Sequence, residues 1–485
     1  MHRILSVVHI LGKVLMVFSL AYLLPILTSL IYRDGQLADF VRPLVLTLGF
    51  GILLWLATRD FKREMKPRDG FLMVVSTWLG VAAFSTLPLL ESLGGLTFTH
   101  AFFECMSGLT TTGATVLSGL DSLPQSINLW RHELSWIGGM GIIVLAVAIL
   151  PLLGVGGMQL SRAETPGPMK DSKLAPRITE TAKNLWLVYF VITLACIIAL
   201  KLAGMSGFDA ICHAFSAMSL GGFSTHDASI GYFHSPAIEI VLTFFMLVAG
   251  MNFATHFLAL RGKSLKLYRA DREGVAFIKL VSVSAVAIAL FLWRTGTYDN
   301  FWTALRHASF NLVSIATDCG LTSIDYNAWP ILAPLWMLFL SCISVSSGST
   351  GGGIKMIRTL VLVKQSQREL LRLLHPAIVN PLKINGLVVQ NNVVYSVLGF
   401  IFLYFMSILV LVFMLVGSGF DFVSSFSAII ACINNVGPGL GQVGPATTYG
   451  GLNSFQAWVC ILAMLLGRLE IFSILIIFTP AFWRK

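Results

Sequence analysis

The chain alternates between long apolar segments and shorter stretches rich in glycine, threonine and serine. Apolar segments long enough to cross roughly 30 Å of hydrocarbon recur along its whole length, and inside a bilayer such segments satisfy their backbone groups as helices. We expect spans at 4–31, 40–58, 71–91, 130–153, 184–204, 236–260, 275–295, 330–362, 393–417 and 453–480. The pattern therefore predicts an all-α integral membrane protein with about ten crossings.

The same order of segments occurs four times. An apolar span is followed by a semi-polar stretch of helical character, a turn of glycine and hydroxyl residues, and a second apolar span. The semi-polar stretches are 100–115, 209–225, 307–322 and 424–440. When their glycines Gly113, Gly222, Gly320 and Gly437 are superposed, small residues coincide at two earlier positions: Ala101, Ala210, Ala308 and Ser425, then Ser107, Ser216, Ser314 and Ala431.

A repeat of roughly a hundred residues is too long for a solenoid unit and fits a module of helix, re-entrant helix and helix. We expect two leading helices in 1–68, followed by pore repeats in 69–160, 161–272, 273–383 and 384–485, the third with a broken second helix.

Composition agrees with a membrane protein. Hydrophobic residues make up 56% of the 485 and charged residues only 12%, whereas a soluble domain carries about 25% charged residues. The N-terminal apolar segment extends past a signal-peptide core and is interpreted as a retained helix. The seven cysteines are scattered without any C-x-x-C pair, so they are interpreted as small hydrophobic residues.

The formal net charge of +10 is concentrated in four stretches. These contain Arg59, Lys62, Arg63, Lys66 and Arg68; Arg162, Lys170, Lys173, Arg177 and Lys183; Arg261, Lys263, Lys266, Arg269 and Arg272; and Lys355, Arg358, Lys364, Arg368, Arg372 and Lys383. The ranges 205–235 and 418–452 contain no Lys or Arg. The positive-inside rule places the basic stretches and both termini in the cytoplasm.

A nucleic-acid-binding role is the alternative for such a basic chain. The basic residues are divided among loops between spans and form no single stripe with interleaved aromatic residues. Anionic lipids or a cytoplasmic partner protein are the expected contacts, and nucleic acid is not.

The short helices suit a cation. A helix of about twelve residues cannot span a membrane, and irregular backbone at membrane depth is tolerated where it lines a wet cavity. Asp209, Asp299 and Asp421 lie at or before the starts of three of these helices, where a carboxylate can cap free N–H groups. Each helix then points its negative C-terminal end at the glycine turn.

Carbonyl oxygens around a glycine can replace the hydration shell of potassium. The alternative is that these are ordinary extracellular turns, but four aligned copies favour a pore.

Here the sequence resembles the superfamily of K+ transporters that includes the bacterial Trk and Ktr membrane subunits and plant HKT proteins, and the TrkH branch in particular. The resemblance covers nearly the whole chain and is carried by TTTGAT, WIGGMGI, LGGFST, AGMNF, IATDCGLT, NNVGPGL and SSGSTGGGIKMIR. It implies a chain folded like four fused subunits of a K+ channel, in a bacterial inner membrane.

The resemblance implies a K+ selectivity filter of backbone carbonyls from four segments. Its residues are Thr110, Thr111, Thr112 and Gly113; Leu220, Gly221 and Gly222; Thr317, Asp318, Cys319 and Gly320; and Asn434, Asn435, Val436 and Gly437. Relatives with serine at the first filter glycine favour Na+, so Gly113 favours K+ here. Asp318, the Asn434–Asn435 pair and Pro438 depart from fourfold symmetry, which predicts moderate selectivity.

A glycine-rich segment interrupts the apolar stretch 330–362. Gly348 and Gly353 have the spacing of a phosphate-binding loop, but Ile354 and Met356 stand where that motif needs Lys and Ser/Thr, so we reject nucleotide binding. We expect a flexible helix break, and the resemblance implies a gate beneath the filter. The gate residues are Ser346, Ser347, Gly348, Ser349, Thr350, Gly351, Gly352, Gly353 and Lys355.

Arg468 lies in the final apolar span, where a charge marks a functional position by default. One interpretation pairs it with a carboxylate such as Glu470. The other, supported by the resemblance, places it in the pore below the filter as an electrostatic barrier to cations.

Other polar residues are interpreted as structural. Glu104 and His213 occupy equivalent places in their helices and are expected to hydrogen-bond neighbouring loops, as is His307. Glu133, with His132 beside it, is expected to cap a helix start.

The function predicted is K+ uptake, with Rb+ also conducted, through a channel-like pore. A symporter coupling K+ to H+ or Na+ is the main alternative, although no chain of buried acids is evident in the sequence. A membrane acyl- or glycosyl-transferase is disfavoured because the histidines lack metal or nucleophile spacing, so no enzyme activity is expected. The resemblance implies a homodimer and separate RCK-type nucleotide-binding subunits, with no cofactor in this chain.

Overall fold

The computed structural model describes residues 2–60, 67–148, 178–343, 345–384 and 387–484. Several basic residues of the predicted cytoplasmic stretches lie outside the described residues: Lys62, Arg63, Lys66, Arg162, Lys170, Lys173 and Arg177. So do the last part of the expected span 130–153 and the boundary expected at 160.

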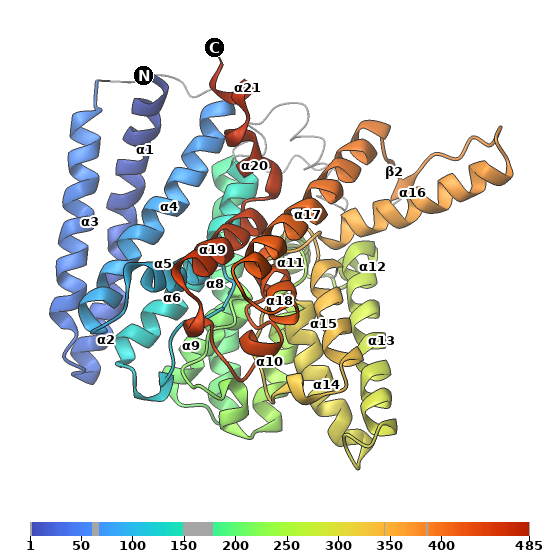
Figure 1. Cartoon of the computed structure of the whole chain (residues 1–485), viewed down its shortest axis with the longest axis horizontal. Helices are drawn as coiled ribbons and strands as arrows, with labels where there is room; N and C mark the ends of the chain where they lie inside the picture. The colour runs from blue at the N-terminus through green and yellow to red at the C-terminus, as the bar shows by residue number, and fades with distance from the viewer. Residues whose placement is uncertain (1, 61–66, 149–177, 344, 385–386, 485) are drawn as a thin grey trace.

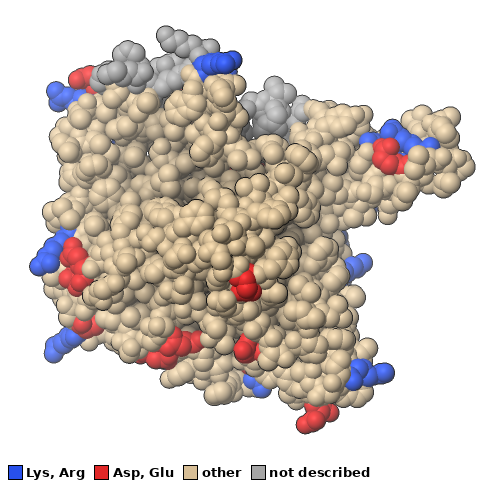
Figure 2. All heavy atoms as spheres, in the orientation of Figure 1, with Lys and Arg blue, Asp and Glu red and all other residues tan. Residues whose placement is uncertain are grey.

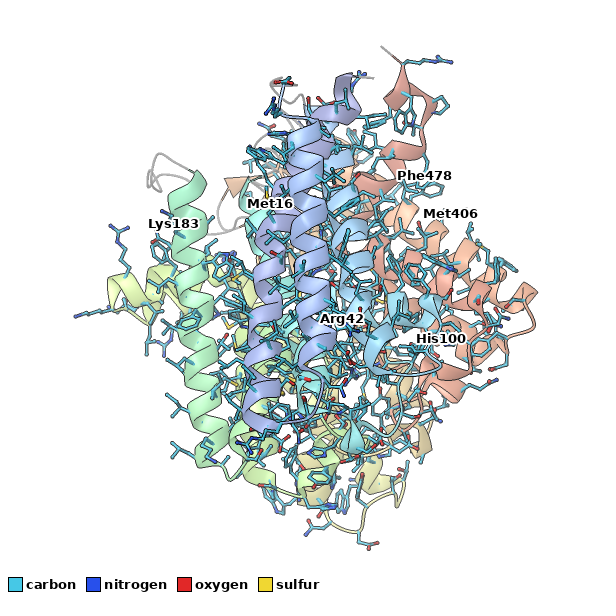
Figure 3. All side chains as sticks on the ribbon, turned by 90° about the vertical axis from the view of Figure 1, so that its left-hand side faces the viewer. Met16, Arg42, His100, Lys183, Met406 and Phe478 are labelled. Carbon is cyan, nitrogen blue, oxygen red and sulfur yellow. The ribbon has the colours of Figure 1, made fainter. Side chains whose placement is uncertain are left out.

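The described part of the chain is almost entirely helical, as predicted. The leading hairpin consists of α1 (His2–Phe18), the 3-10 turn Ser19–Tyr22, α2 (Leu23–Tyr32) and α3 (Leu37–Ala57). Its two arms cross closely, because a Cβ added to Gly12 would lie 2.8 Å from the carbonyl oxygen of Gly51, and one added to Gly51 would lie 2.8 Å from that of Gly12. Small residues allow such close approach of membrane helices. Figure 3 shows this pair standing side by side on the face that carries Met16 and Arg42.

Four sets of helices follow (Figure 1). In each set the second helix is the short one expected from the sequence, with 12 to 16 residues. The first set is α4 (Pro67–Ser92), α5 (Phe98–Leu109) and α6 (Gln125–Ala148); the second is α8 (Ile178–Leu202), α9 (Gly207–Ser219), α10 (Pro236–Ala249), α11 (Phe253–Gly262) and α12 (Lys266–Ala270). The third is α13 (Arg272–Arg294), α14 (Phe301–Ala316), α15 (Leu332–Ile343) and α16 (Met356–Leu374); the fourth is α17 (Asn391–Gly417), α18 (Phe422–Ile433), α19 (Ser454–Arg468), α20 (Ile471–Leu475) and α21 (Pro480–Trp483).

Short 3-10 turns and one small ladder complete the described structure. The turns are Leu120–Ser122, Ser229–Phe233, Tyr326–Ala328, Gly441–Val443, Tyr449–Gly451 and Ile476–Phe478. The strands β1 (Lys383–Ile384) and β2 (Leu387–Val388) pair antiparallel with Lys383 opposite Val388. The ladder was not predicted, but it does not change the all-α class.

Six described helices are long and apolar enough to cross a membrane, or up to eight if each bent pair is one span. The spans predicted at 236–260 and 453–480 are not continuous helices, because each is broken into two helices that meet at 96° and 115° respectively. At the first bend the Asn252 side chain accepts from Ala254 N and starts a new helix. At the second, Glu470 has a positive φ of 57°, which an α-helix cannot contain. The break predicted within 330–362 is confirmed, between α15 and α16.

The hydrophobic core forms two main clusters, and each includes buried residues of the short helices. One joins the leading hairpin to the first and fourth sets, through side chains such as Trp130 and Met464, and the other joins the second and third sets, through side chains such as Met246 and Phe277. Helix α16 leaves this body and projects sideways (Figure 1). Charged side chains are few on the face in Figure 2 and lie mostly toward its edges and on α16.

Candidate functional site: a glycine ring and the loop beneath it

The four short helices are each capped at the N-terminus by a side chain. The capping side chains are Thr97, Ser206, Asn300 and Asp421, which accept from His100 N, Asp209 N, Trp302 N and Ser424 N. The predicted cap by Asp421 is confirmed. The predicted caps by Asp209 and Asp299 are wrong, because Ser206 and Asn300 have the extended backbone that a cap requires, while Asp209 lies in the first turn.

After each short helix the backbone takes the same unusual course. The residue two positions before each glycine has a positive φ: Thr111 at 53°, Leu220 at 55°, Asp318 at 64° and Asn435 at 60°. The glycines themselves follow with φ values of 77° for Gly113, 66° for Gly222, 82° for Gly320 and 97° for Gly437. Alternation between left-handed and other conformations turns successive carbonyl groups toward one side of the segment. This geometry recurs in all four segments.

The four segments close into a ring. A Cβ added to Gly113 would lie 2.5 Å from the Gly221 carbonyl oxygen. One added to Gly222 would collide with the Cys319 carbonyl oxygen, one added to Gly320 with that of Val436, and one added to Gly437 would lie 2.6 Å from that of Thr112. Each glycine therefore contacts the residue before the next glycine, and the fourth contact returns to the first segment. We call residues 110–113, 220–222, 317–320 and 434–437 the glycine ring.

All four glycines of the ring line one cavity of about 220 Å³ on the side of the capped helix ends. All of the predicted filter residues are buried except Gly113 and Gly222, which are half-buried. The structure thus brings together every residue that the sequence predicted for the filter.

The loop between α15 and α16, residues 345–355, lies directly against the opposite side of the glycine ring. The Thr350 hydroxyl donates to the Met218 carbonyl oxygen across 3.1 Å. A Cβ on Gly351 would lie 3.0 Å from the Thr317 carbonyl oxygen, and one on Gly352 would collide with that of Asn434. The 345–355 loop therefore touches the inner ends of the third and fourth segments and the end of α9, which leads into the second segment.

Arg468 fixes this loop from the last long helix. Its Nη1 donates to the Thr350 carbonyl oxygen at 2.7 Å and its Nη2 to the Gly138 carbonyl oxygen at 2.9 Å, with the side chain 2% exposed. The alternative pairing with Glu470 is wrong, because Glu470 accepts from Arg358 Nη2 at 3.0 Å. The break between α19 and α20 turns the two side chains apart.

Lys355 adds a second cation beside the loop. Its Nζ donates to the Gly351 carbonyl oxygen at 2.5 Å and to the Ser349 hydroxyl at 3.5 Å. Lys355 and Arg468 both act electrostatically on the carboxylate of Asp318, which is fully buried in the glycine ring. The centre of the protein therefore holds one buried acid and two cations below the ring.

The chain is similar in sequence to known transport proteins. Residues 36–485 match the family model for TrkH, a cation transport protein. The chain is 47% identical to the Trk system potassium uptake protein TrkH of Salmonella typhimurium and 40% identical to TrkG of Escherichia coli, covering 99% of this chain in both, 99% of the first relative and 98% of the second. The chain belongs to the TrkH family.

The fold also matches that of a solved TrkH structure. It superposes on the crystal structure of the potassium transporter TrkH from Vibrio parahaemolyticus with a TM-score of 0.91 and 44% sequence identity, covering 99% of this chain and 100% of that one. These relatives are transporters and not enzymes. This TrkH-family chain is therefore a multi-pass membrane protein.

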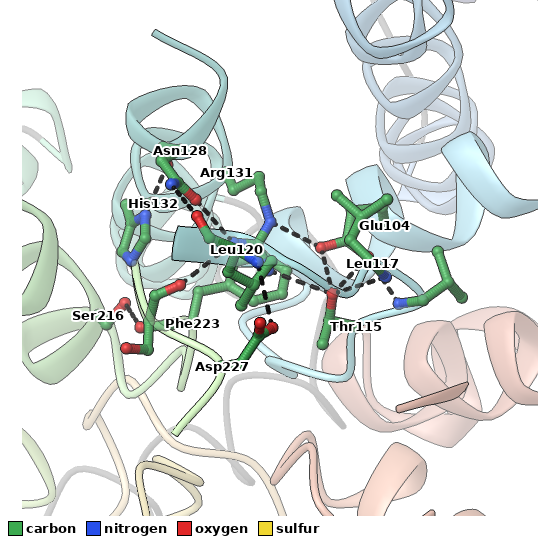
Figure 4. Close-up of polar contacts among 12 residues, drawn as sticks. Glu104, Thr115, Leu117, Leu120, Asn128, Arg131, His132, Ser216, Phe223 and Asp227 are labelled. Atoms are coloured by element: carbon green, nitrogen blue, oxygen red, sulfur yellow. Dashed lines mark hydrogen bonds and ion pairs between the residues drawn. The ribbon is translucent and has the colours of Figure 1, made fainter. Parts of the chain in front are cut away.

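A buried ion pair supports the outer side of the ring in the TrkH-family chain (Figure 4). Arg131 Nε donates to Glu104 Oε1 at 2.8 Å, and both side chains are 1% exposed. Glu104 also accepts from the Thr115 hydroxyl and from Val116 N, while Arg131 Nη1 donates to the Ser224 carbonyl oxygen. The pair thus joins the backbone that leaves the first ring segment to that which leaves the second.

The other repeats use neutral residues for the same purpose. His213 Nε2 contacts the Ser224 hydroxyl at 2.9 Å, so the loop contacts predicted for Glu104 and His213 are confirmed. In the third repeat Asn311 performs this role, donating to the Ser323 hydroxyl at 2.9 Å and accepting from Ser323 N. In the fourth, Ser427 accepts from Leu440 N at 2.8 Å.

Two of the minor predictions are corrected. His307 stacks on Tyr298 with ring centroids 5.6 Å apart and does not hold the loop. Asn311 was missed, although Glu104, His213 and Asn311 stand at the same distance before their glycines in the sequence. Glu133 caps nothing, because α6 begins at Gln125 after Pro124 and places Glu133 inside the helix.

Proposed function

We propose that this chain takes up K+ across the membrane through a channel-like pore, and conducts Rb+ as well. The single observation that carries the proposal is the closed glycine ring, in which four segments with matching backbone conformations surround one axis. Four carbonyl-bearing segments around one point supply the oxygen cage that replaces a potassium hydration shell. The relatives named as potassium uptake proteins support the same ion.

The filter role of the glycine ring, the gate role of the 345–355 loop and the barrier role of Arg468 belong to this proposal. The loop and Arg468 fill the space beneath the ring, where a conducting ion would have to pass. A buried guanidinium in a region of low dielectric repels a cation strongly. Conduction then requires the loop to move aside and Arg468 to release Thr350.

Flux into liposomes that contain the purified chain tests the proposal. With K+ trapped inside, radioactive rubidium should accumulate above the level in empty liposomes, and external K+ should compete more strongly than external Na+. Equal flux with and without the protein would overturn it.

A symporter coupled to H+ or Na+ is the second candidate, and Asp318 is the observation that favours it. Its carboxylate is fully buried within the ring segment itself, 3.2 Å from the position of a Cβ on Gly351. Reversal potentials measured across planar bilayers separate the two mechanisms. A potential that follows the K+ gradient alone supports the channel, and one that moves with external pH supports coupling.

The repeat boundaries, the membrane topology and the partner proteins are also part of the proposal. We propose a leading pair in 1–68, pore repeats in 69–160, 161–272, 273–383 and 384–485, both termini in the cytoplasm of a bacterial inner membrane, and assembly as a homodimer with RCK-type nucleotide-binding subunits. Both described ends of the chain lie at the same edge in Figure 1, as this topology requires. Copurification with such a ring of subunits, and a change of flux when it is added, would test the partner.

A further inference from the structure

A buried carboxylate outside the ring contacts the 345–355 loop region. Glu273 lies in the first turn of α13, two residues after the capping residue Asp271, and its side chain is 1% exposed. Glu273 is not among the residues assigned to the filter, the gate or the barrier.

Glu273 binds both ends of the loop through one oxygen atom. Its Oε1 accepts from Ser347 N at 2.6 Å, near the start of the loop, and from Ile357 N at 3.0 Å, just after its end. The carboxylate therefore holds the two ends of the loop together.

The second contact also replaces a missing helix cap. Helix α16 begins at Met356, and its N-cap residue Lys355 provides no side-chain hydrogen bond to the first turn. The Ile357 N–H would otherwise be one of the unsatisfied groups of that turn. Glu273 supplies the acceptor from another helix, so the start of α16 is tied to the start of α13.

Two backbone hydrogen bonds from the bend between α10 and α11 also hold the 345–355 loop. Ser346 N donates to the Gly250 carbonyl oxygen at 3.0 Å, and Phe253 N donates to the Gly348 carbonyl oxygen at 3.1 Å. These backbone bonds cannot be removed by a side-chain change. Glu273 is thus the side chain through which the anchoring of both loop ends can be altered, while Arg468 holds the middle of the loop.

We propose that Glu273 is a positioning residue that holds the 345–355 loop closed beneath the glycine ring by binding both of its ends. The proposal rests on the pore function proposed above. Release of either end frees the loop to leave the ring, so weakening this contact should favour the conducting state.

Rubidium uptake into liposomes tests the effect on conduction. Glu273→Ala should raise the initial rate about tenfold, the factor expected when two buried hydrogen bonds are lost from the closed state only. Glu273→Gln should raise it less, because the amide oxygen still accepts both N–H groups. Glu91→Gln, a carboxylate change on a partly exposed residue of α4, should leave the rate unchanged.

A second measurement reports on the loop directly. Ser349 is 4% exposed, so a Ser349→Cys variant should react slowly with a thiol reagent, measured against the parent protein with its native cysteines. Adding Glu273→Ala should speed this reaction about tenfold, in step with the rise in flux. A purely structural role would lower thermal stability and raise neither rate.

The two measurements separate this proposal from the pore function. If Arg468→Ala raises rubidium uptake and Glu273→Ala does not, the pore function stands and the role of Glu273 is overturned. If no variant carries ions above empty liposomes, the pore function fails, and the labelling rate alone decides whether Glu273 holds the loop.

Discussion

Arg468 donates a hydrogen bond to the backbone of Thr350, a residue 118 positions earlier in the chain. The bond links the last long helix to the loop that contacts the glycine ring, and the second bond to Gly138 links both to the first repeat. One side chain thus joins three repeats below the ring. A guanidinium suits this task because its fixed fork of donors reaches two acceptors at once.

Arg468→Ala should raise rubidium uptake about tenfold, since it removes both the loop contact and the positive charge beneath the ring. Arg468→Lys should give a smaller rise, because it keeps the charge but loses the two-point contact. Arg42→Ala, a change at a side chain 68% exposed, is the matched control and should leave uptake unchanged. Uptake in Arg468→Ala at or below the wild-type rate would remove the barrier role.

Gly113→Ser should lower the preference for K+ over Na+ about tenfold. The added Cβ would lie 2.5 Å from the Gly221 carbonyl oxygen, so the first two ring segments must move apart. Competition of K+ and Na+ for rubidium uptake measures the preference. Gly35→Ser is the control, because Gly35 also has a positive φ of 82° but has no atom within 4 Å of an added Cβ. An unchanged ion preference in Gly113→Ser would contradict the filter assignment.

Glu104→Gln should lower the free energy of unfolding by about 3 kcal/mol, because it leaves the buried Arg131 charge without its partner. It should also slow uptake, since Arg131 lines the cavity outside the ring. The double variant Glu104→Gln with Arg131→Met should recover part of both losses, which a double-mutant cycle measures. Additive losses would mean that the pair is not coupled.

The outer loops should lose stability in acid through Asp121. Burial opposes the charged carboxylate, but contacts from the His226 ring and from Asp227 N outweigh it and hold the pKa of Asp121 below its ordinary value. A group with a lowered folded pKa contributes stability above its unfolded pKa of about 3.9, and the contribution disappears as pH falls through the folded value.

Thermal unfolding followed by tryptophan fluorescence between pH 6 and pH 3 checks this expectation. Asp121→Asn should melt about 2 °C below the wild type at pH 6, and the difference should close toward pH 3. A difference that stays constant over this range would show that the carboxylate charge is not involved.

The repeat itself was predictable because it is a local property. Hydrophobic spans, short helices and glycine turns each leave a periodic signal in the residues that form them. Gly113, Gly222, Gly320 and Gly437 were located from their aligned sequences, and the structure gives all four a positive φ. The same alignment contained Asn311. Its loop contact was not predicted, because an uncharged asparagine is common in ordinary turns and helices.

The helix bends were not predictable from hydropathy. Both Gly250–Asn252 and Leu469–Glu470 lie inside continuous apolar stretches, and a single glycine or carboxylate is compatible with a straight helix. Contacts with other repeats meet both bends, where Phe253 N donates to the Gly348 carbonyl oxygen and Arg358 pairs with Glu470.

By itself the sequence determined the all-α membrane class, the fourfold repeat and the four glycines of the ring, because local chain properties and hydrophobicity govern these. Only the tertiary structure decided how distant residues pair. It assigned Glu470 to Arg358, Arg468 to Thr350, and Glu273 to both ends of the 345–355 loop. Such pairings depend on where separate helices meet, and a buried charge selects whichever partner the packing brings within reach.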